Sequence, residues 1–141
     1  MTLTYQQEQF LHAATARAAI LDLTARQNRA YSDGDRERWV ATFRHSGASY
    51  TRDGEVFTDL RAAFDGGDGQ RLVTVDHEIR IDGIHAEQRC VAVLYATMYG
   101  DTTLRATGVL HDKLIYERGG WYFESRALAW DSVPSRHPLV M

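Results

Sequence analysis

The chain has 141 residues, a length typical of one domain. Hydrophobic residues make up 44% of it and charged residues 25%, which excludes disordered and fibrous classes of protein. Its 16 Lys and Arg against 19 Asp and Glu give a net charge of -3, so it lacks the basic excess of a nucleic-acid or anionic-membrane binder. We therefore expect one domain over residues 1–141 with no nucleic-acid or membrane partner.

The first residues, MTLTYQQEQF, have neither the basic start nor the apolar stretch of a secretion signal. No apolar run approaches the roughly 20 residues that cross a bilayer. A cytoplasmic location is therefore expected. The single cysteine, Cys90, lies in an apolar run, which predicts a buried, unreactive thiol and excludes an internal disulfide.

The first third of the chain has a helical pattern. From Gln6 to about Ser32 it is rich in Ala, Leu, Gln and Arg and poor in β-branched residues. Gly34 is expected to end this helix in a left-handed conformation, and an Asp of the same turn to cap the next helix. Residues three or four apart predict one shared face, formed by Phe10, Ala14, Ala18, Leu21, Ala25 and Asn28.

Short elements follow this helix. A second helix is predicted around Trp39 and Phe43, and two short strands around a turn at 53–54. Thr58 is expected to cap a third short helix. A flexible loop at 65–70 is expected near the mouth of any pocket.

From Arg71 onward the hydrophobic period is two, which is typical of strands. Long strands are predicted at 71–81, 87–98, 104–117 and 121–130, with turns at 82–83, 101–102 and 119–120. An extended tail is expected at 131–141. Helices followed by such a meander predict an α+β fold in which a curved antiparallel sheet and the helices enclose a pocket. One face of the first strand is assigned to Val73, Val75, His77, Ile79 and Ile81.

Three stretches resemble the SnoaL-like branch of the nuclear transport factor 2-like (NTF2-like) superfamily. They are AILDLTARQNRAYSDGDRERWVATF, VDHEIRIDGIHA and GVLHDKLIYERGGWYFESRALAW, and the resemblance spans about residues 12–130. The first contains a helix that ends in Ser-Asp-Gly-Asp, which resembles the family pattern of a helix ending in Asp-x-Gly-Asp, and the last a Gly-Gly-Trp turn with an Arg five residues after the Trp. The resemblance implies an NTF2-like cone. It also implies either cofactor-independent lyase (dehydratase-like), isomerase or polyketide cyclase chemistry on a small molecule, or a non-catalytic accessory role.

Three residues form the predicted catalytic set. Asp33 matches the aspartate that pairs with a histidine in dehydratase-like members, although it could instead cap a helix. His77 is the expected imidazole partner because it lies on an otherwise apolar strand face, where it could also be a hydrogen-bonded core histidine. Arg126 matches the family's strand arginine, which binds an anionic or carbonyl oxygen; the alternative is a cross-strand ion pair on the outer face.

Two positions depart from the family pattern. Leu72 stands where an ungapped alignment places the family histidine, and Asn28 stands where several members carry a tyrosine or lysine. His111 and Asp112 are neighbours on one strand and take opposite faces, so only one of them can line the pocket. The residues expected to line it, or otherwise to be plain core, are Asn28, Tyr31, Trp39, Tyr50, His111 and Trp130.

No cofactor and no metal are expected. The six histidines show no spacing typical of a zinc site, and no glycine-rich phosphate loop or serine nucleophile motif is present. Two hypotheses remain. In the first, Asp33 orients His77, His77 moves a proton of a small apolar substrate, and Arg126 or a tyrosine holds the developing charge. In the second, the chain is a binding or accessory module. Under both, a homo-oligomer (dimer or trimer) is expected because the open sheet face carries apolar residues.

Overall fold

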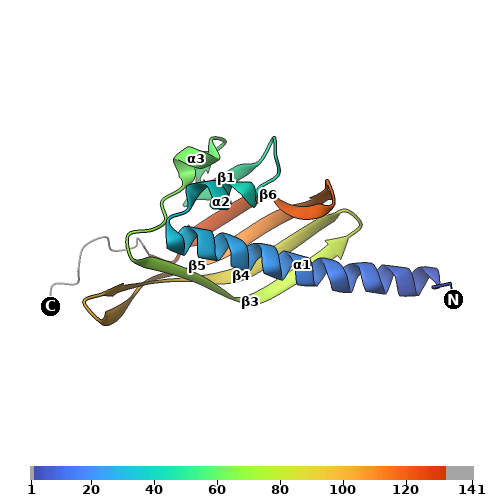
Figure 1. The fold of residues 1–141 in the computed structure, drawn as a ribbon, viewed down its shortest axis with the longest axis horizontal. Coiled ribbons are helices and arrows are strands. Elements are labelled where there is room, and N and C mark those ends of the chain that lie inside the picture. The colour runs from blue at the N-terminus through green and yellow to red at the C-terminus, as the bar shows by residue number, and fades with distance from the viewer. Residues whose placement is uncertain (1, 133–141) are drawn as a thin grey trace.

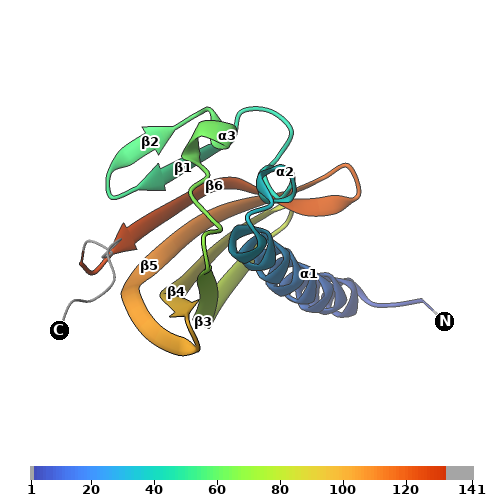
Figure 2. The same cartoon turned by 60° about the vertical axis from the view of Figure 1, so that its left-hand side comes forward.

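A long N-terminal helix lies across the concave face of a curved sheet in the computed structural model, which describes residues 2–132 (Figures 1 and 2). The predicted α+β class is confirmed. From residue 133 on, the expected extended tail lies outside the described residues. In chain order the elements are α1 (Tyr5–Asp33), α2 (Arg36–Ala41), β1 (Ser49–Arg52), β2 (Glu55–Phe57), α3 (Leu60–Ala63), β3 (Gln70–Asp82), β4 (His85–Met98), β5 (Asp101–Glu117) and β6 (Gly120–Trp130).

The sheet has the strand order β2-β1-β6-β5-β4-β3. Neighbouring strands are antiparallel except β1 and β6, which run parallel. The four long strands match the prediction within a few residues. The turn between β4 and β5 differs, because Tyr99 and Gly100 take the positive φ values, 52° and 82°, and Asp101 already belongs to β5.

Helix termini are set largely as local chemistry predicts. Gly34 ends α1 with a φ of 70°, and the side chain of Asp35 accepts a hydrogen bond from the Arg38 N–H to cap α2. Asp59 rather than Thr58 caps α3, since its carboxylate accepts from two backbone N–H groups of the first turn.

The predicted buried face of α1 is wrong. Phe10 is 77% exposed, and buried positions begin only at Ala16, because the first turns of the helix extend past the sheet (Figure 1). The helix lacks a strongly apolar stripe, so the face that packs on the sheet includes polar side chains with partners there. That face consists of Ala16, Ile20, Leu23, Thr24, Gln27, Ala30 and Tyr31.

A β-bulge in β3 divides that strand into two halves with opposite facing. Val75 pairs with Val91 and Glu78 with Arg89, so β3 carries one residue more than β4 across this interval. Asp76 takes a φ of 54° there. The single face predicted for β3 is therefore wrong before the bulge, where Val73 and Val75 are exposed, and right after it, where Ile79 is buried.

A second bulge, in β6, has the same effect on Arg126. Lys113 pairs with Ser125 and Leu114 with Phe123, so Glu124 is the extra residue. Phe123 and Arg126 therefore both point into the core, although their odd spacing would place them on opposite faces of a regular strand. Which side chains enter the sheet interior depends on these irregularities rather than on strict alternation.

The bulge in β3 can be tested by changing Asp76. Asp76→Gly should leave the free energy of unfolding unchanged or slightly higher, because glycine adopts positive φ without steric cost. Asp76→Val should lower it by about 1–2 kcal/mol, since a β-branched residue is strained in this conformation. Urea denaturation measures both. Equal stabilities of the two variants would contradict the assigned backbone conformation.

Candidate functional site

The interior of the sheet is crossed by one row of polar side chains. Gln88 on β4 pairs in register with Asp112 on β5, which pairs with Arg126 on β6. Arg126 and Asp112 are 1% and 0% exposed at their side chains, and the Arg126 Nε donates to Asp112 Oδ1 at 2.9 Å. A guanidinium does not lose its proton in a protein, so its burial requires an anion beside it. Asp112 supplies that anion.

Arg126 is held on its other sides as well. It donates through Nη1 to the side-chain oxygen of Gln27, and its guanidinium carbon lies 4.6 Å from the centre of the Phe123 ring. Burial raises the pKa of the Asp112 carboxyl, while the charge of Arg126 and the hydrogen bonds from Gln88 and Arg126 act in the opposite direction. The ion pair is thus stabilised by its hydrogen bonds against a cost of desolvation.

Two threonines, Thr24 on α1 and Thr42 at the C-terminal cap of α2, decide how the buried glutamines are oriented. Thr24 Oγ1 donates to the Ile20 carbonyl at 2.8 Å, so towards Gln88 its oxygen can only accept. Gln88 therefore presents its NH₂ group to Thr24, at 3.0 Å, and to Asp112 Oδ2, at 2.9 Å. Thr42 orients Gln27 in the same way: it donates to the Trp39 carbonyl at 2.6 Å and accepts from the Gln27 amide at 2.8 Å.

This orientation fixes the proton of His77. With its NH₂ group committed, Gln88 offers only its oxygen to the imidazole, at 2.8 Å from Nδ1. A neutral His77 must then carry its proton on Nδ1 and keep the lone pair on Nε2. Within the described part of the chain no hydrogen bond engages Nε2. The network therefore prepares a half-buried imidazole as a proton acceptor.

His77 lines an open groove between the second half of α1 and the beginning of β3. The groove has a volume of about 520 Å³, within the range of small-molecule sites. Its lining is mixed in chemistry. Leu21, Ala25, Leu72, Val73 and Tyr95 provide apolar surface, and Thr24, Asn28, Arg29, Ser32, Asp33, Arg71, Thr74 and His77 provide polar groups.

A separate enclosed cavity lies on the other side of Arg126. Its volume is only about 10 Å³, roughly that of one water. Arg126 and the predicted lining residues Tyr31, Trp39, Tyr50 and Trp130 all border it. Burial and the nearby Asp65 carboxylate raise the pKa of both phenols, that of Tyr50 to about 12, so both remain hydrogen-bond donors at neutral pH.

The predicted pairing of Asp33 with His77 is not found. Asp33 is exposed at the end of α1, and this end meets β3 at Leu72, whose N–H donates to Ser32 Oγ at 3.2 Å. His77 lies five residues further along the strand, a distance of roughly 16 Å. Asp33 therefore lies beside the position where the family carries its histidine, and the leucine there cannot pair with it.

His111 is also placed differently from the expectation that it lines the pocket. It is exposed on the outer face of the sheet, where it lines a second open groove of about 510 Å³ with Arg80, Glu87 and Lys113, because Asp112 takes the inward position on β5. The alternative of an outer-face ion pair for Arg126 is likewise excluded, since its pair with Asp112 lies inside. Cys90 is buried as predicted, and burial raises the pKa of its thiol to about 11.

Thr24, Gln27, Gln88 and Asp112 were not selected from the sequence as site residues. The one available signal was polar residues at positions where alternation predicts an inward side chain, as in Leu110, Asp112 and Leu114. Within residues 2–132 no group of three His, Cys, Asp or Glu side chains has an arrangement suited to a metal ion. None of the helices described there is long and apolar enough to span a membrane.

Comparison with known proteins identifies relatives of the same architecture. The SnoaL-like domain matches residues 12–127. An NTF2-like protein with a cystatin-like fold from Novosphingobium aromaticivorans is 18% identical, with a TM-score of 0.81 over 96% of this chain and 94% of that chain. A candidate scytalone dehydratase from the same organism is 14% identical, with a TM-score of 0.74 over 91% of each chain.

A third solved structure is an enzyme component. The beta subunit of a candidate aromatic-ring-hydroxylating dioxygenase, also from Novosphingobium aromaticivorans, is 18% identical, with a TM-score of 0.71 over 86% of this chain and 92% of that chain. At such identities the likeness shows the fold alone, an NTF2-like cone. No curated protein matches the sequence.

Removing the positive charge of the buried ion pair should lower the free energy of unfolding by an amount that depends on pH. Arg126→Met leaves Asp112 buried without its partner and should lower the free energy of unfolding by about 3–5 kcal/mol. Without Arg126 the pKa of Asp112 rises further, so the folded variant binds a proton that the unfolded chain releases. The loss should therefore be smaller at about pH 5 than at about pH 8.

A double variant provides the control for this change. Arg126→Met with Asp112→Leu replaces both charges by apolar groups and should recover most of the loss, with little pH dependence. Urea denaturation of the three proteins at both pH values measures these effects. A single variant as stable as the starting protein at about pH 8 would contradict the ion pair.

The tautomer of His77 can be observed directly. Long-range proton–nitrogen NMR correlations should show the neutral ring protonated at Nδ1. Gln88→Leu should remove this preference because the acceptor for that proton is lost. The exposed His111 serves as the control, since its correlations should not change. A neutral His77 protonated at Nε2 in the unmodified protein would disprove the assigned orientation of Gln88.

Proposed function

Because the chain belongs to the SnoaL-like domain family, we propose that it is a cofactor-independent acid–base enzyme acting on a small, largely apolar metabolite. The observation that carries the proposal is the hydrogen bond between Gln88 Oε1 and His77 Nδ1, which leaves Nε2 free to accept a proton beside a groove of ligand size. Packing alone does not require these buried polar side chains. Burying so many of them lowers the stability of the fold unless every polar group has a hydrogen-bond partner.

The proposed first step is removal of a proton from a carbon next to a carbonyl. His77 Nε2 takes the proton, and the electron pair of the broken C–H bond forms an enolate. In elimination the imidazolium then returns the proton to a leaving hydroxyl, which departs as water; in isomerisation it returns the proton to another carbon. An enolate carbon that attacks a second carbonyl of the same molecule would give ring closure. The groove thus supports lyase, isomerase or cyclase chemistry.

Arg126 and Asp112 have a positioning role in this mechanism. Both are buried, and the guanidinium of Arg126 donates hydrogen bonds to Asp112, to Gln27 and to the Sγ atom of Cys90. Neither lines the groove. Arg126 fixes Asp112, and Asp112 orients Gln88. Gln88 then orients His77, as the carboxylate of a catalytic triad orients its histidine. This replaces the orienting role first assigned to Asp33.

A solved structure of the same fold supports the proposal. One neighbour of the same fold is described as a candidate scytalone dehydratase, which favours elimination among the three reaction types. A small-molecule substrate, a homo-oligomeric state (dimer or trimer) and a cytoplasmic location stay predictions.

A non-catalytic role is the second candidate. It is favoured by the small size of the enclosed cavity, about 10 Å³, into which no substrate fits without rearrangement. The beta subunit among the structural neighbours shows that this fold also occurs as a component of a larger assembly. In this case the groove would hold a ligand unchanged or be covered by another subunit.

Hydrogen–deuterium exchange at a carbon atom of added small molecules distinguishes the two candidate functions, and the true substrate need not be known. A panel of small apolar hydroxyketones is incubated in deuterated buffer, and proton NMR follows the loss of signal at the carbon next to the carbonyl. The enzyme should accelerate exchange for at least one compound, and His77→Gln should reduce the rate by about 10²–10⁴-fold.

Asp33→Asn is the matched control because Asp33 lines the same groove without contacting His77. It should retain nearly the full rate. An unchanged rate in His77→Gln would exclude the proposed base, and absence of exchange with ligand binding retained would favour the non-catalytic candidate.

A further inference from the structure

One buried polar atom in the groove lacks a protein partner. The side-chain oxygen Oδ1 of Asn28 is buried and makes no hydrogen bond within residues 2–132. The other half of the same amide is engaged, since Nδ2 donates to Thr74 Oγ1 at 2.9 Å. Leaving a buried carbonyl oxygen unpaired costs about 1–3 kcal/mol, so such an atom calls for an explanation.

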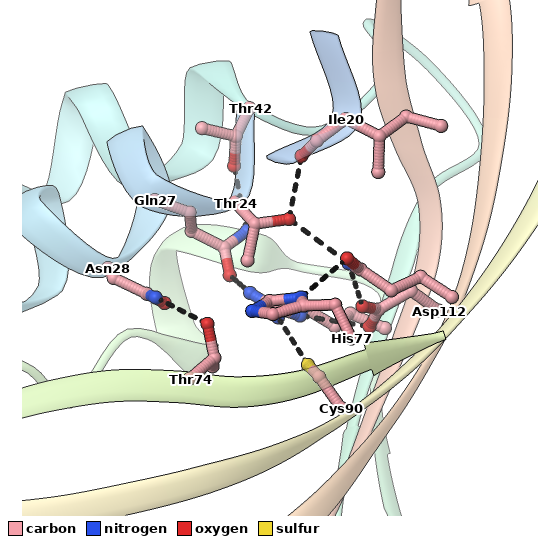
Figure 3. A network of polar contacts seen from close by, with 11 residues as sticks. Ile20, Thr24, Gln27, Asn28, Thr42, Thr74, His77, Cys90 and Asp112 are labelled. Atoms are coloured by element: carbon pink, nitrogen blue, oxygen red, sulfur yellow. Dashed lines mark hydrogen bonds and ion pairs between the residues drawn. The ribbon is translucent and has the colours of Figure 1, made fainter. Parts of the chain in front are cut away.

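Asn28 lies beside the proposed base. On α1 it follows Thr24 by one turn, and Thr24 orients Gln88. On β3 its partner Thr74 precedes the bulge and His77 lies within it, so that both side chains line the same groove. Figure 3 shows the Asn28–Thr74 pair next to the polar network that includes His77.

The remaining surroundings restrict what can satisfy this oxygen. Leu21, Ala25, Leu72 and Val73 form apolar walls of the groove. An uncharged donor suits this acceptor, because the groove already carries two arginines, Arg29 and Arg71, against one carboxylate, Asp33, and so disfavours a further cation. A hydroxyl on an apolar body meets both conditions.

We infer that Asn28 is a specificity-determining residue whose Oδ1 accepts a hydrogen bond from a hydroxyl group of the ligand. The inference deepens the proposed function, because it assigns a substrate class to the same groove: apolar molecules that carry a free hydroxyl within reach of Asn28 while another part of the molecule lies at His77. A site built around a buried acceptor discriminates against analogues that lack the donor, since its own polar atom is then left unpaired. Thr74 is the positioning residue, as it holds the amide through Nδ2.

A matched pair of probes tests this assignment on the full chain. β-Naphthol carries a hydroxyl on an apolar body, and its methyl ether has the same body without the donor. Titration followed by NMR should give a dissociation constant about two- to tenfold lower for β-naphthol. The Asn28 side-chain amide resonances should shift more with β-naphthol than with the ether, which has the same ring without the donor.

Asn28→Leu keeps a side chain of similar shape without an acceptor and should bind the two probes equally. Thr74→Val should reduce the preference for β-naphthol because the amide loses its anchor. Circular dichroism checks the fold of each variant; if Asn28→Leu does not fold, the amide resonances of the unmodified protein decide. Equal affinity of the unmodified protein for both probes, or unmoved amide resonances with β-naphthol, overturns the inference.

This test is independent of catalysis. Asn28-dependent discrimination without any hydrogen–deuterium exchange would leave the ligand class intact and exclude the enzyme. Exchange without discrimination would leave the enzyme intact and exclude the assignment of Asn28.

Discussion

The charge of Arg126 is the constraint on which the interior of this protein depends. A guanidinium stays protonated, so once the β6 bulge directs it inward, an anion and several acceptors must accompany it. Asp112 on the neighbouring strand and Gln27 on α1 provide them. Each of these groups in turn needs partners, and the polar chain ends only where it meets the imidazole of His77.

These hydrogen-bonding requirements connect the packing of the helices on the sheet to the tautomer of His77. The hydroxyl groups of Thr24 and Thr42 donate hydrogen bonds to backbone carbonyls and can therefore only accept hydrogen bonds from the glutamines. The orientation of two amides follows from that single fact, and the tautomer of His77 follows from one of the amides. A network whose polar groups all have partners is rigid, which holds the imidazole of His77 in place without a directly bonded carboxylate. Asn28 stands apart from it, because its side-chain oxygen makes no hydrogen bond within residues 2–132.

Local patterns predicted the elements well and the site only in part. Period-two alternation located four long strands, and Gly34 and Asp35 ended one helix and began the next as expected. The buried face of α1 was missed because polar residues such as Gln27 occupy it, and hydrophobicity cannot indicate a position that is buried for its hydrogen bonds. The Asp33–His77 pair was wrong because two residues on different elements were joined without knowing where the helix meets the strand.

By itself the sequence determined the class of fold, the order of its helices and strands, and the inward position of the aromatic residues around the enclosed cavity, since these follow from periodicity, capping and burial of apolar surface. Only the tertiary structure decided which carboxylate partners the arginine and which nitrogen of His77 is free. One extra residue in β3 and one in β6 change which face of the sheet the following side chains point to. The local preferences of Asp76 and Glu124 do not predict this change. Side-chain facing in a sheet is a property of pairing between strands, and pairing is fixed only when the whole sheet closes around the helix.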